Sequence, residues 1–349
     1  MSNYSLKKTL VRINRFKKEK LRGRLLMVVF AAYFVIISGF MLLNGMWFSP
    51  DQFIIAGLVL ALFVAQPLAF LRDWVPFVFL FLSYEYLRGL APKLGMGVHI
   101  FPMIHVDQFL VGGVLTANLQ KLLYTPGTLH IYDYFFSILY MMHFISLLVF
   151  AFFLWLKKRH EFKRFVITTI ALAYAGFLTY VLYPAMPPWM ASAQGFIPHV
   201  ANVASDTFAS FVQTVHIPSV YQFMDPNPVA AMPSLHAAFP MLVYLFMVDI
   251  FGKKARPFII YPMLVWVAII YTGNHYILDT IVGILYAYAA FYGVKYFYSR
   301  RARKEEQQEQ LGHQLPRGVV PAWEAEGFSL AAVDLPQGDA GVPGGEARN

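Results

Sequence analysis

Residues 257–299 read PFIIYPMLVWVAIIYTGNHYILDTIVGILYAYAAFYGVKYFYS. The stretch contains two apolar runs, 257–274 and 278–299, separated by a few residues around His275. A helix that crosses a lipid bilayer needs about 20 mostly apolar residues, and each run has that character. Because so few residues separate the runs, the sequence predicts two membrane helices joined as a tight hairpin. The runs are continuous rather than alternating, which excludes a transmembrane β-barrel.

Six more apolar segments continue the pattern toward the N-terminus: 235–252, 165–184, 134–156, 74–90, 53–71 and 25–46. The sequence therefore predicts an all-α integral membrane protein, a polytopic helical bundle of about eight transmembrane helices. Composition supports this class, because 58% of the 349 residues are hydrophobic and only 13% are charged, whereas soluble domains have about 25% charged residues. Segment 25–46 is longer than a signal-peptide core and lacks a cleavage site, so we expect it to remain as a span.

Basic residues recur at regular places between the predicted spans. Residues 1–24 form a basic N-terminus with nine Lys and Arg, and further basic residues follow the second, fourth, sixth and eighth spans. Short basic loops lie on the cytoplasmic side of a membrane, and eight spans place all of them on that side. We therefore expect both termini in the cytoplasm and two long outer loops, at about 91–133 and 185–234. The outer face then carries three basic residues, Arg88, Lys93 and Lys121.

Charge and cysteine content exclude several classes of protein. The net charge of +9 is accounted for by the basic clusters beside the spans, so it does not indicate nucleic-acid binding. The chain has no Cys, which excludes disulfides, thiolate metal sites and thiol nucleophiles. Residues 300–349 begin with a basic cluster and become rich in Gln, Glu, Gly and Pro from about 305. We expect a disordered cytoplasmic tail there.

Two short motifs carry candidate chemistry at the outer ends of neighbouring spans. The first is Pro233-Ser234-Leu235-His236, which opens the span 235–252. Pro and Ser are ordinary residues at a helix start, so a capping role alone fits the motif. A helix start also offers free N–H groups that hold phosphate, and His236 lies in that first turn.

The second motif is Asn274-His275-Tyr276-Ile277-Leu278-Asp279. His275 and Asp279 are four residues apart and share one face if the stretch is helical. A carboxylate there can accept a proton from one imidazole nitrogen, which leaves the other nitrogen as a nucleophile. Either motif alone arises by chance, and a lone interfacial His is commonly structural. Their coincidence at adjacent outer helix ends favours a single functional pocket.

A third stretch, YPAMPPW from Tyr183 to Trp189, ends the span 165–184. Its three prolines cannot continue a helix. A rigid exit turn with Trp189 as an interfacial anchor explains the stretch, and so does one wall of a pocket for a lipid headgroup.

Together the three stretches resemble the type-2 phosphatidic acid phosphatase superfamily, especially its branch of inositol phosphorylceramide synthases. That branch shares the Pro-Pro-Trp turn, a Pro-Ser-x-His motif and a His-Tyr-x-x-Asp-like motif. The segment DQFLVGG, residues 107–113, is also similar to a loop of bacterial relatives. The likeness covers roughly residues 74–299 and implies a six-helix catalytic membrane domain, to which two additional spans within 25–73 are joined.

The resemblance also implies roles for the matching residues. His275 would be the nucleophile that forms a phosphohistidine, Asp279 would orient it, and His236 would protonate the leaving oxygen and then activate the acceptor. The substrate would be a membrane lipid with a phosphate-containing headgroup, and no cofactor or metal is expected. A His/Asp site for a divalent ion is a weaker alternative, because only three plausible ligands converge. We expect the substrate to be contacted by Ser234, Asn274, Tyr183 and Trp189.

The sequence departs from the superfamily pattern where phosphate would bind. The superfamily has a Ser-Arg pair before the nucleophilic His, but the matching position here is Ile269. Phosphate still needs a compensating charge. Arg88, at the end of the span 74–90, is our candidate, although an interfacial anchor paired with Glu85 fits it equally. His143, inside the span 134–156, is a weaker candidate for a direct role.

Three functions remain open at this point. The first is transfer of a lipid headgroup to an alcohol acceptor, and the second is hydrolysis of a lipid phosphate or polyprenyl diphosphate. The third is lipid transport without chemistry, but transporters place ionisable groups near the bilayer midplane with repeat symmetry, whereas this cluster lies at one surface. The resemblance favours transfer, with the site on the extracytoplasmic side of the cell membrane.

Overall fold

The computed structural model describes residues 67–94, 97–215 and 227–314. The predicted basic N-terminus 1–24, the span 25–46 and most of the span 53–71 lie outside these residues. The regular elements of the described part are helices, and the only β-structure there consists of isolated β-bridges. This confirms the predicted all-α class. The chain divides into one compact unit through Lys295 and a second from Tyr296 onward. All contacts described below lie within the first unit.

Four helical stretches of the described part are long and apolar enough to cross a membrane: Ile131–Lys157, Arg159–Leu182, Leu235–Tyr271 and Ile277–Arg301. The first two are α6 (Ile131–Lys157) and α7 (Arg159–Leu182), at the places predicted for 134–156 and 165–184. These apolar helices are those of a membrane protein. The count of eight spans stays a prediction, because the described residues do not include the first span.

Helix α3 (Pro67–Leu90) contains the predicted span 74–90 but begins earlier. The predicted break between the spans 53–71 and 74–90, where Arg72 is the basic residue, is therefore wrong, since the helix continues through it. Arg72, the basic residue that suggested the loop, is exposed and pairs with its neighbour Asp73 at 3.3 Å, so the helix does not bury its charge. The carboxylate of Asp73 accepts a hydrogen bond from Trp155 Nε1 at 3.2 Å and pairs with Arg159 at 2.8 Å.

The first of the two helices in the predicted C-terminal hairpin is short. Helix α11 (Leu235–Phe251) ends at Gly252, whose φ of 66° turns the chain, and the 3-10 helix η2 (Gly252–Ile259) leads into α12 (Ile260–Tyr271). At about 1.5 Å per residue, α12 is shorter than the roughly 30 Å apolar layer of a bilayer. The predicted span 257–274 was too long, because its first residues form η2 and its last residues form a turn.

Helix α13 (Ile277–Gln314) continues well beyond the predicted span end at 299. We expected disorder from about 305, but residues 305–314 are helical. Glu, Gln, Arg and Lys dominate residues 300–310, and these unbranched side chains have high helix propensity. Residues 315–349, the rest of the predicted tail, lie outside the described part of the chain.

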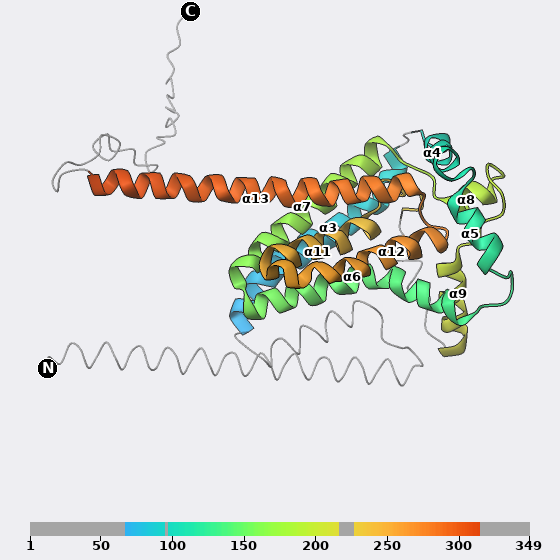
Figure 1. The fold of residues 1–349 in the computed structure, drawn as a ribbon, viewed down its shortest axis with the longest axis horizontal. Helices are drawn as coiled ribbons and strands as arrows, with labels where there is room; N and C mark the ends of the chain where they lie inside the picture. Colours follow the sequence, from blue (N-terminus) through green and yellow to red (C-terminus); the bar gives the residue numbers. More distant parts are fainter. Residues whose placement is uncertain (1–66, 95–96, 216–226, 315–349) are drawn as a thin grey trace, which may run out of the picture. The chain divides into compact units, whose positions relative to one another are not determined.

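The two predicted outer loops contain short helices of their own. The first holds the 3-10 helix η1 (Ala91–Leu94) and the helices α4 (Phe101–Val111) and α5 (Leu115–Leu123), and the second holds α8 (Pro188–Ala193) and α9 (Val203–Val215). Figure 1 shows α4, α5, α8 and α9 together at one end of the long helices. We call these four helices the cap. The motif residues lie at this end of the bundle.

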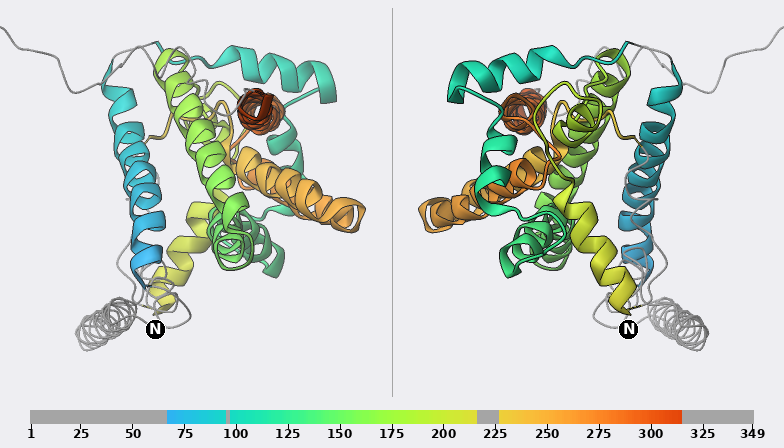
Figure 2. Two further views of the ribbon diagram at one scale, coloured as in Figure 1. Left: turned by 90° about the vertical axis from the view of Figure 1, so that its left-hand side faces the viewer. Right: turned by 90° about the vertical axis from the view of Figure 1, so that its right-hand side faces the viewer.

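Aromatic side chains fill the core between the long helices. Five of them follow α3 at alternating spacings of four and three residues, which places them on one face of the helix; all are buried: Phe70, Trp74, Phe77, Phe81 and Tyr84. Helix α3 packs against α7, and Figure 2 shows the two side by side in blue and green. The core continues through α6 and α11 to α13, where the Phe246 and Phe291 rings meet edge to face.

Helix α13 crosses the start of α11 at very close range. A Cβ atom at Gly283 would lie 2.2 Å from the carbonyl oxygen of Ser234. That distance is far below van der Waals contact, so Gly is required there. The Ser234 N–H also donates to the carbonyl oxygen of Asp279 at 3.0 Å. This crossing joins the two candidate motifs directly through the backbone.

Replacing Gly283 with Ala should therefore separate the two motifs. We expect overpacking to cost about 1–3 kcal/mol of stability and to lower the activity that remains. Gly293→Ala is the matched control, because a Cβ atom at Gly293, on the same helix, would meet nothing within 4 Å. Thermal unfolding in detergent measures both variants. Equal melting temperatures for the two would contradict the close crossing.

Candidate functional site

His236 lies in the first turn of α11, where Ser234 caps the helix. The Ser234 hydroxyl oxygen accepts a hydrogen bond from the Ala237 N–H at 3.2 Å, and Ser234 itself is fully buried. The Tyr180 hydroxyl donates to the carbonyl oxygen of Pro233 at 2.8 Å, which anchors the residues before the cap. This arrangement fixes the start of α11 and thereby the backbone that carries His236.

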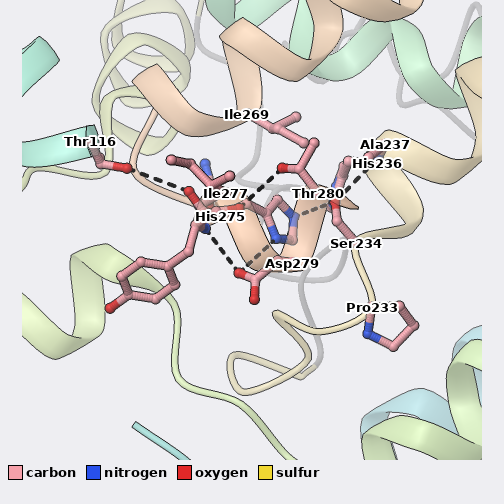
Figure 3. A network of polar contacts seen from close by, with 12 residues as sticks. Thr116, Pro233, Ser234, His236, Ala237, Ile269, His275, Ile277, Asp279 and Thr280 are labelled. Carbon is pink, nitrogen blue, oxygen red and sulfur yellow. Dashed lines mark hydrogen bonds and ion pairs between the residues drawn. The ribbon is translucent and has the colours of Figure 1, made fainter. Parts of the chain in front are cut away.

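The two candidate histidines meet directly. His236 Nδ1 lies 3.0 Å from His275 Nε2, within hydrogen-bond distance. Figure 3 shows the His275 ring between His236 and Asp279. His275 is 3% exposed, so its ring is held by protein on nearly all sides. The sequence predicted one pocket for His236, His275 and Asp279, and in the structure the three side chains lie in a line.

Asp279 lies behind His275, on the side away from His236. Its Oδ2 is 3.6 Å from His275 Nδ1, an electrostatic contact longer than a hydrogen bond. The same oxygen accepts the Tyr276 N–H at 2.9 Å, which holds the carboxylate in place. Within the described part of the chain, His275 Nδ1 and Asp279 Oδ1 are buried without a hydrogen-bond partner. A small approach of the two side chains would satisfy the imidazole N–H.

Two side chains of α6 hold the His236 ring. The Tyr140 ring stacks on it with a centroid separation of 4.5 Å, and the His143 ring meets it edge to face at 4.2 Å. His143 Nδ1 is hydrogen-bonded to the carbonyl oxygen of Tyr140. His143 therefore contacts a candidate catalytic residue and is not among the residues that line the pocket. A direct role for His143 stays a prediction.

A pocket opens in front of the two histidines. It has about 310 Å³ of empty space, part of which is open to solvent. The predicted residues Arg88, Trp189 and Asn274 all line it beside His236 and His275. The other lining residues are Tyr140, Pro187, Asn227, Pro228, Ala230 and Ala231.

Arg88 reaches the pocket from the last turn of α3. Its side chain is 11% exposed and pairs with Glu85 at 3.0 Å, so the predicted ion pair is present. Arg88 also lines the pocket with both histidines. The pairing with Glu85 and the place in the pocket are therefore compatible. A buried guanidinium beside two imidazoles offers positive charge to an anionic group.

Asn227 is a pocket residue that the sequence analysis missed. Its side chain donates to the carbonyl oxygen of Arg88 at 3.1 Å and accepts the Val229 N–H at 3.1 Å. Asn227 thereby ties the end of α3 to the segment that leads into the Pro-Ser-x-His motif. Its position six residues before Pro233 was a weak signal, because Asn is common in loops.

Tyr183 does not line this pocket, unlike Trp189, the other predicted contact residue on its stretch. Its ring stacks on His99 with a centroid separation of 3.6 Å, and burial raises the pKa of its phenol above the usual value. Ser234 likewise does not line the pocket; its hydroxyl accepts a hydrogen bond at the N-terminus of α11. For Tyr183 and Ser234, substrate contact stays a prediction.

The cap holds the connection 272–276 between α12 and α13. Gly273 has a φ of 89°, and a Cβ atom there would lie 2.3 Å from the carbonyl oxygen of Ala201. The Trp189 N–H donates to the carbonyl oxygen of Gly273 at 3.0 Å. The Pro-Pro-Trp turn is thus bonded to the residues just before His275. Among the described residues, no group of three or more His, Cys, Asp or Glu has an arrangement that could hold a metal ion.

Comparisons with known proteins agree with this geometry. The model of the PAP2 superfamily matches residues 103–293, more than half of the chain. A phosphoinositol dihydroceramide synthase of Bacteroides thetaiotaomicron is 28% identical over 270 residues, which cover 72% of this chain and 86% of that enzyme. No solved structure matches the chain significantly.

Proposed function

This chain belongs to the PAP2 superfamily, and from that premise we propose that it is a membrane-embedded lipid phosphotransferase. It moves a phosphate-containing headgroup from a donor lipid to an alcohol acceptor. The observation that carries the proposal is the line of Asp279, His275 and His236, which opens onto a pocket lined by Arg88. The similarity to a phosphoinositol dihydroceramide synthase supports transfer over hydrolysis.

In the first step, His275 Nε2 attacks the phosphorus atom of the donor. The bond from phosphorus to the oxygen of the leaving lipid alcohol breaks, and His236 gives that oxygen a proton. Asp279 stays ionised: it accepts a hydrogen bond from the Nδ1–H of His275 and stabilises the positive charge that develops on the ring. The product is a phosphohistidine that still carries the headgroup.

In the second step, the acceptor hydroxyl gives its proton to His236 and attacks the same phosphorus atom. The phosphorus–nitrogen bond breaks, and both histidines return to their starting state. In the structure the two imidazoles are 3.0 Å apart, so the phosphoryl group must enter between them and replace their hydrogen bond. Contacts among catalytic groups commonly change when substrate binds.

Arg88 takes the place of the guanidinium that is absent at Ile269. Ile269 is fully buried and lies behind the connection, where its carbonyl oxygen accepts the His275 N–H. Arg88 comes from α3 instead and meets the pocket from another side. There it would hold the equatorial oxygens, whose charge must be stabilised in the transition state.

Replacing Arg88 with Ala should lower kcat/KM by about 10²-fold or more, because a preorganised charge in a mostly buried site is lost. Arg88→Lys should be intermediate, since it keeps the charge but loses the paired donors. Glu85→Gln is the matched control, because it breaks the same ion pair and leaves the guanidinium. If Arg88→Ala and Glu85→Gln lower kcat/KM equally, Arg88 has a structural role only and does not bind the phosphate.

The pocket lies at the end of the bundle that carries the cap. We propose that this end faces the extracytoplasmic side, since the basic loops predicted as cytoplasmic are at the other helix ends. The lipid chains stay in the bilayer while the headgroup enters the pocket.

An acceptor assay tests the function. The purified full chain in vesicles is given a phosphoinositol lipid labelled in its headgroup, with and without dihydroceramide, the substrates that the relative's name suggests. We expect a labelled product only when the acceptor is present. Rapid release of the headgroup into water without acceptor would make the chain a hydrolase. Absence of turnover, also with other phospholipids and lipid alcohols, would contradict enzymatic transfer.

A further inference from the structure

Asp107 is a buried carboxylate that the proposed chemistry does not use. It lies in α4, within the DQFLVGG stretch, and is fully buried. Its Oδ1 accepts the Ile277 N–H at 3.0 Å, and its Oδ2 accepts the Leu115 N–H at 3.1 Å. Ile277 is the first residue of α13 and Leu115 is the first residue of α5. One carboxylate therefore caps two helices.

The two capped helices hold the segment that carries His275. Helix α13 begins two residues after His275 and bears Asp279 in its first turn. From the start of α5, the Thr116 hydroxyl donates to the carbonyl oxygen of His275 at 3.4 Å. Further along α5, the Gln120 amide donates to the carbonyl oxygen of Tyr271 at 2.8 Å. The connection is thus fastened on both sides of the candidate nucleophile.

From this geometry we infer that Asp107 is a positioning residue for the transfer reaction. Its ionised carboxylate holds the starts of α5 and α13 together, and so keeps Asp279 in place behind His275. The inference rests on the proposed function. It gives the cap a role in catalysis rather than in folding alone.

The ionised form is required because only a carboxylate accepts at both oxygens. A protonated carboxyl carries a hydrogen on one oxygen, which then becomes a donor and cannot serve its N–H partner equally. Burial raises the pKa of Asp107 to about 6, with the nearby charge of Asp279 adding to the rise and the two backbone N–H groups opposing it. Among the described residues, the Tyr276 phenol is a further titratable group that faces it, and burial raises the pKa of that phenol.

The pH dependence follows with a definite sign. Above pH 6 Asp107 is ionised and both helix starts are held, so the site is aligned. As the pH falls through about 6, the carboxylate is protonated and one of the two N–H groups loses its acceptor. Part of the activity should therefore be lost on the acid side.

Asp107→Asn imitates the protonated state at every pH, because the amide accepts at one oxygen and donates from nitrogen. Above pH 7 we expect kcat at least about tenfold below that of the natural chain, with a small change in KM, since misalignment near the reacting atoms is costly. The ratio of the two kcat values should shrink toward one near pH 5. Both proteins contain the same histidines, so the effect of histidine titration on kcat cancels in this ratio.

Asp133→Asn is the matched control. Asp133 is equally buried and also accepts a backbone N–H at a helix start, that of His130 at 2.7 Å, while its other oxygen accepts the Tyr271 hydroxyl at the end of α12 rather than an N–H of α13. We expect a loss of thermal stability with a kcat ratio that does not vary with pH. If the kcat ratio of Asp107→Asn is also independent of pH, or if its kcat per folded molecule equals that of the natural chain, Asp107 has only a structural role. The inference then fails. A natural chain without transferase activity would instead overturn the proposed function.

Discussion

Replacing His275 with Ala should abolish turnover, with kcat lowered by at least about 10³-fold, because the nitrogen that forms the bond to phosphorus is removed. The variant should still fold and insert, since a smaller side chain leaves the backbone contacts of the connection intact. Acceptor-dependent product, measured per folded molecule, is the readout. His275 is buried between His236 and Asp279, so a neighbouring side chain is poorly placed to substitute for it.

A second histidine provides the control for this experiment. His105 lies on α4 in the same cap, but it is exposed and does not line the pocket. His105→Ala should keep kcat within about twofold of the natural value. Activity that survives in His275→Ala at the level of His105→Ala would remove the nucleophile from the mechanism.

Asp279→Asn should lower kcat by about 10³–10⁴-fold while the fold is kept. The amide oxygen of Asn can still accept the hydrogen bond from the Tyr276 N–H, so the backbone there should keep its conformation. The amide N–H₂ group, however, donates where the carboxylate accepts, and it would favour the His275 tautomer with its proton on Nε2. A comparable substitution of the third triad residue in serine proteases costs about 10⁴-fold.

The control for Asp279 is the same chemical change elsewhere in the cap. Asp206, in the first turn of α9, accepts a hydrogen bond from the Tyr124 hydroxyl at 2.9 Å and lies outside the pocket lining. Asp206→Asn should therefore be nearly as active as the natural chain. A kcat for Asp279→Asn within a few-fold of that control would show that the carboxylate does not orient the nucleophile.

Periodic and local features of this fold could be predicted from the sequence. Apolar runs located α6 and α11 to within three residues, because the hydropathy of a span is a property of consecutive residues; α7 begins six residues before its predicted span, at Arg159. The spacing of His275 and Asp279 and the Pro-Ser-x-His motif pointed to one pocket. The structure brings these residues together, and the PAP2 match confirms the family that they suggested.

Other features depend on contacts between distant parts of the chain. Asn227 reaches the carbonyl oxygen of Arg88 across 139 residues, and Asp107 reaches Ile277 across 170. No spacing rule connects such pairs in a single sequence. Helix ends were also missed where a tertiary contact satisfied a charge, as at Asp73 in α3, where Arg159 and Trp155 supply the partners.

The central claim is that the headgroup is bonded to His275 before it reaches the acceptor. Its most direct test is to mix the full chain with a headgroup-labelled donor lipid without acceptor, quench in alkali, and map the label by mass spectrometry of the digested protein. The account predicts an acid-labile phosphoramidate that carries the headgroup on His275, absent in His275→Ala and discharged when acceptor is added. Label on another residue, or label that persists in His275→Ala, would contradict it.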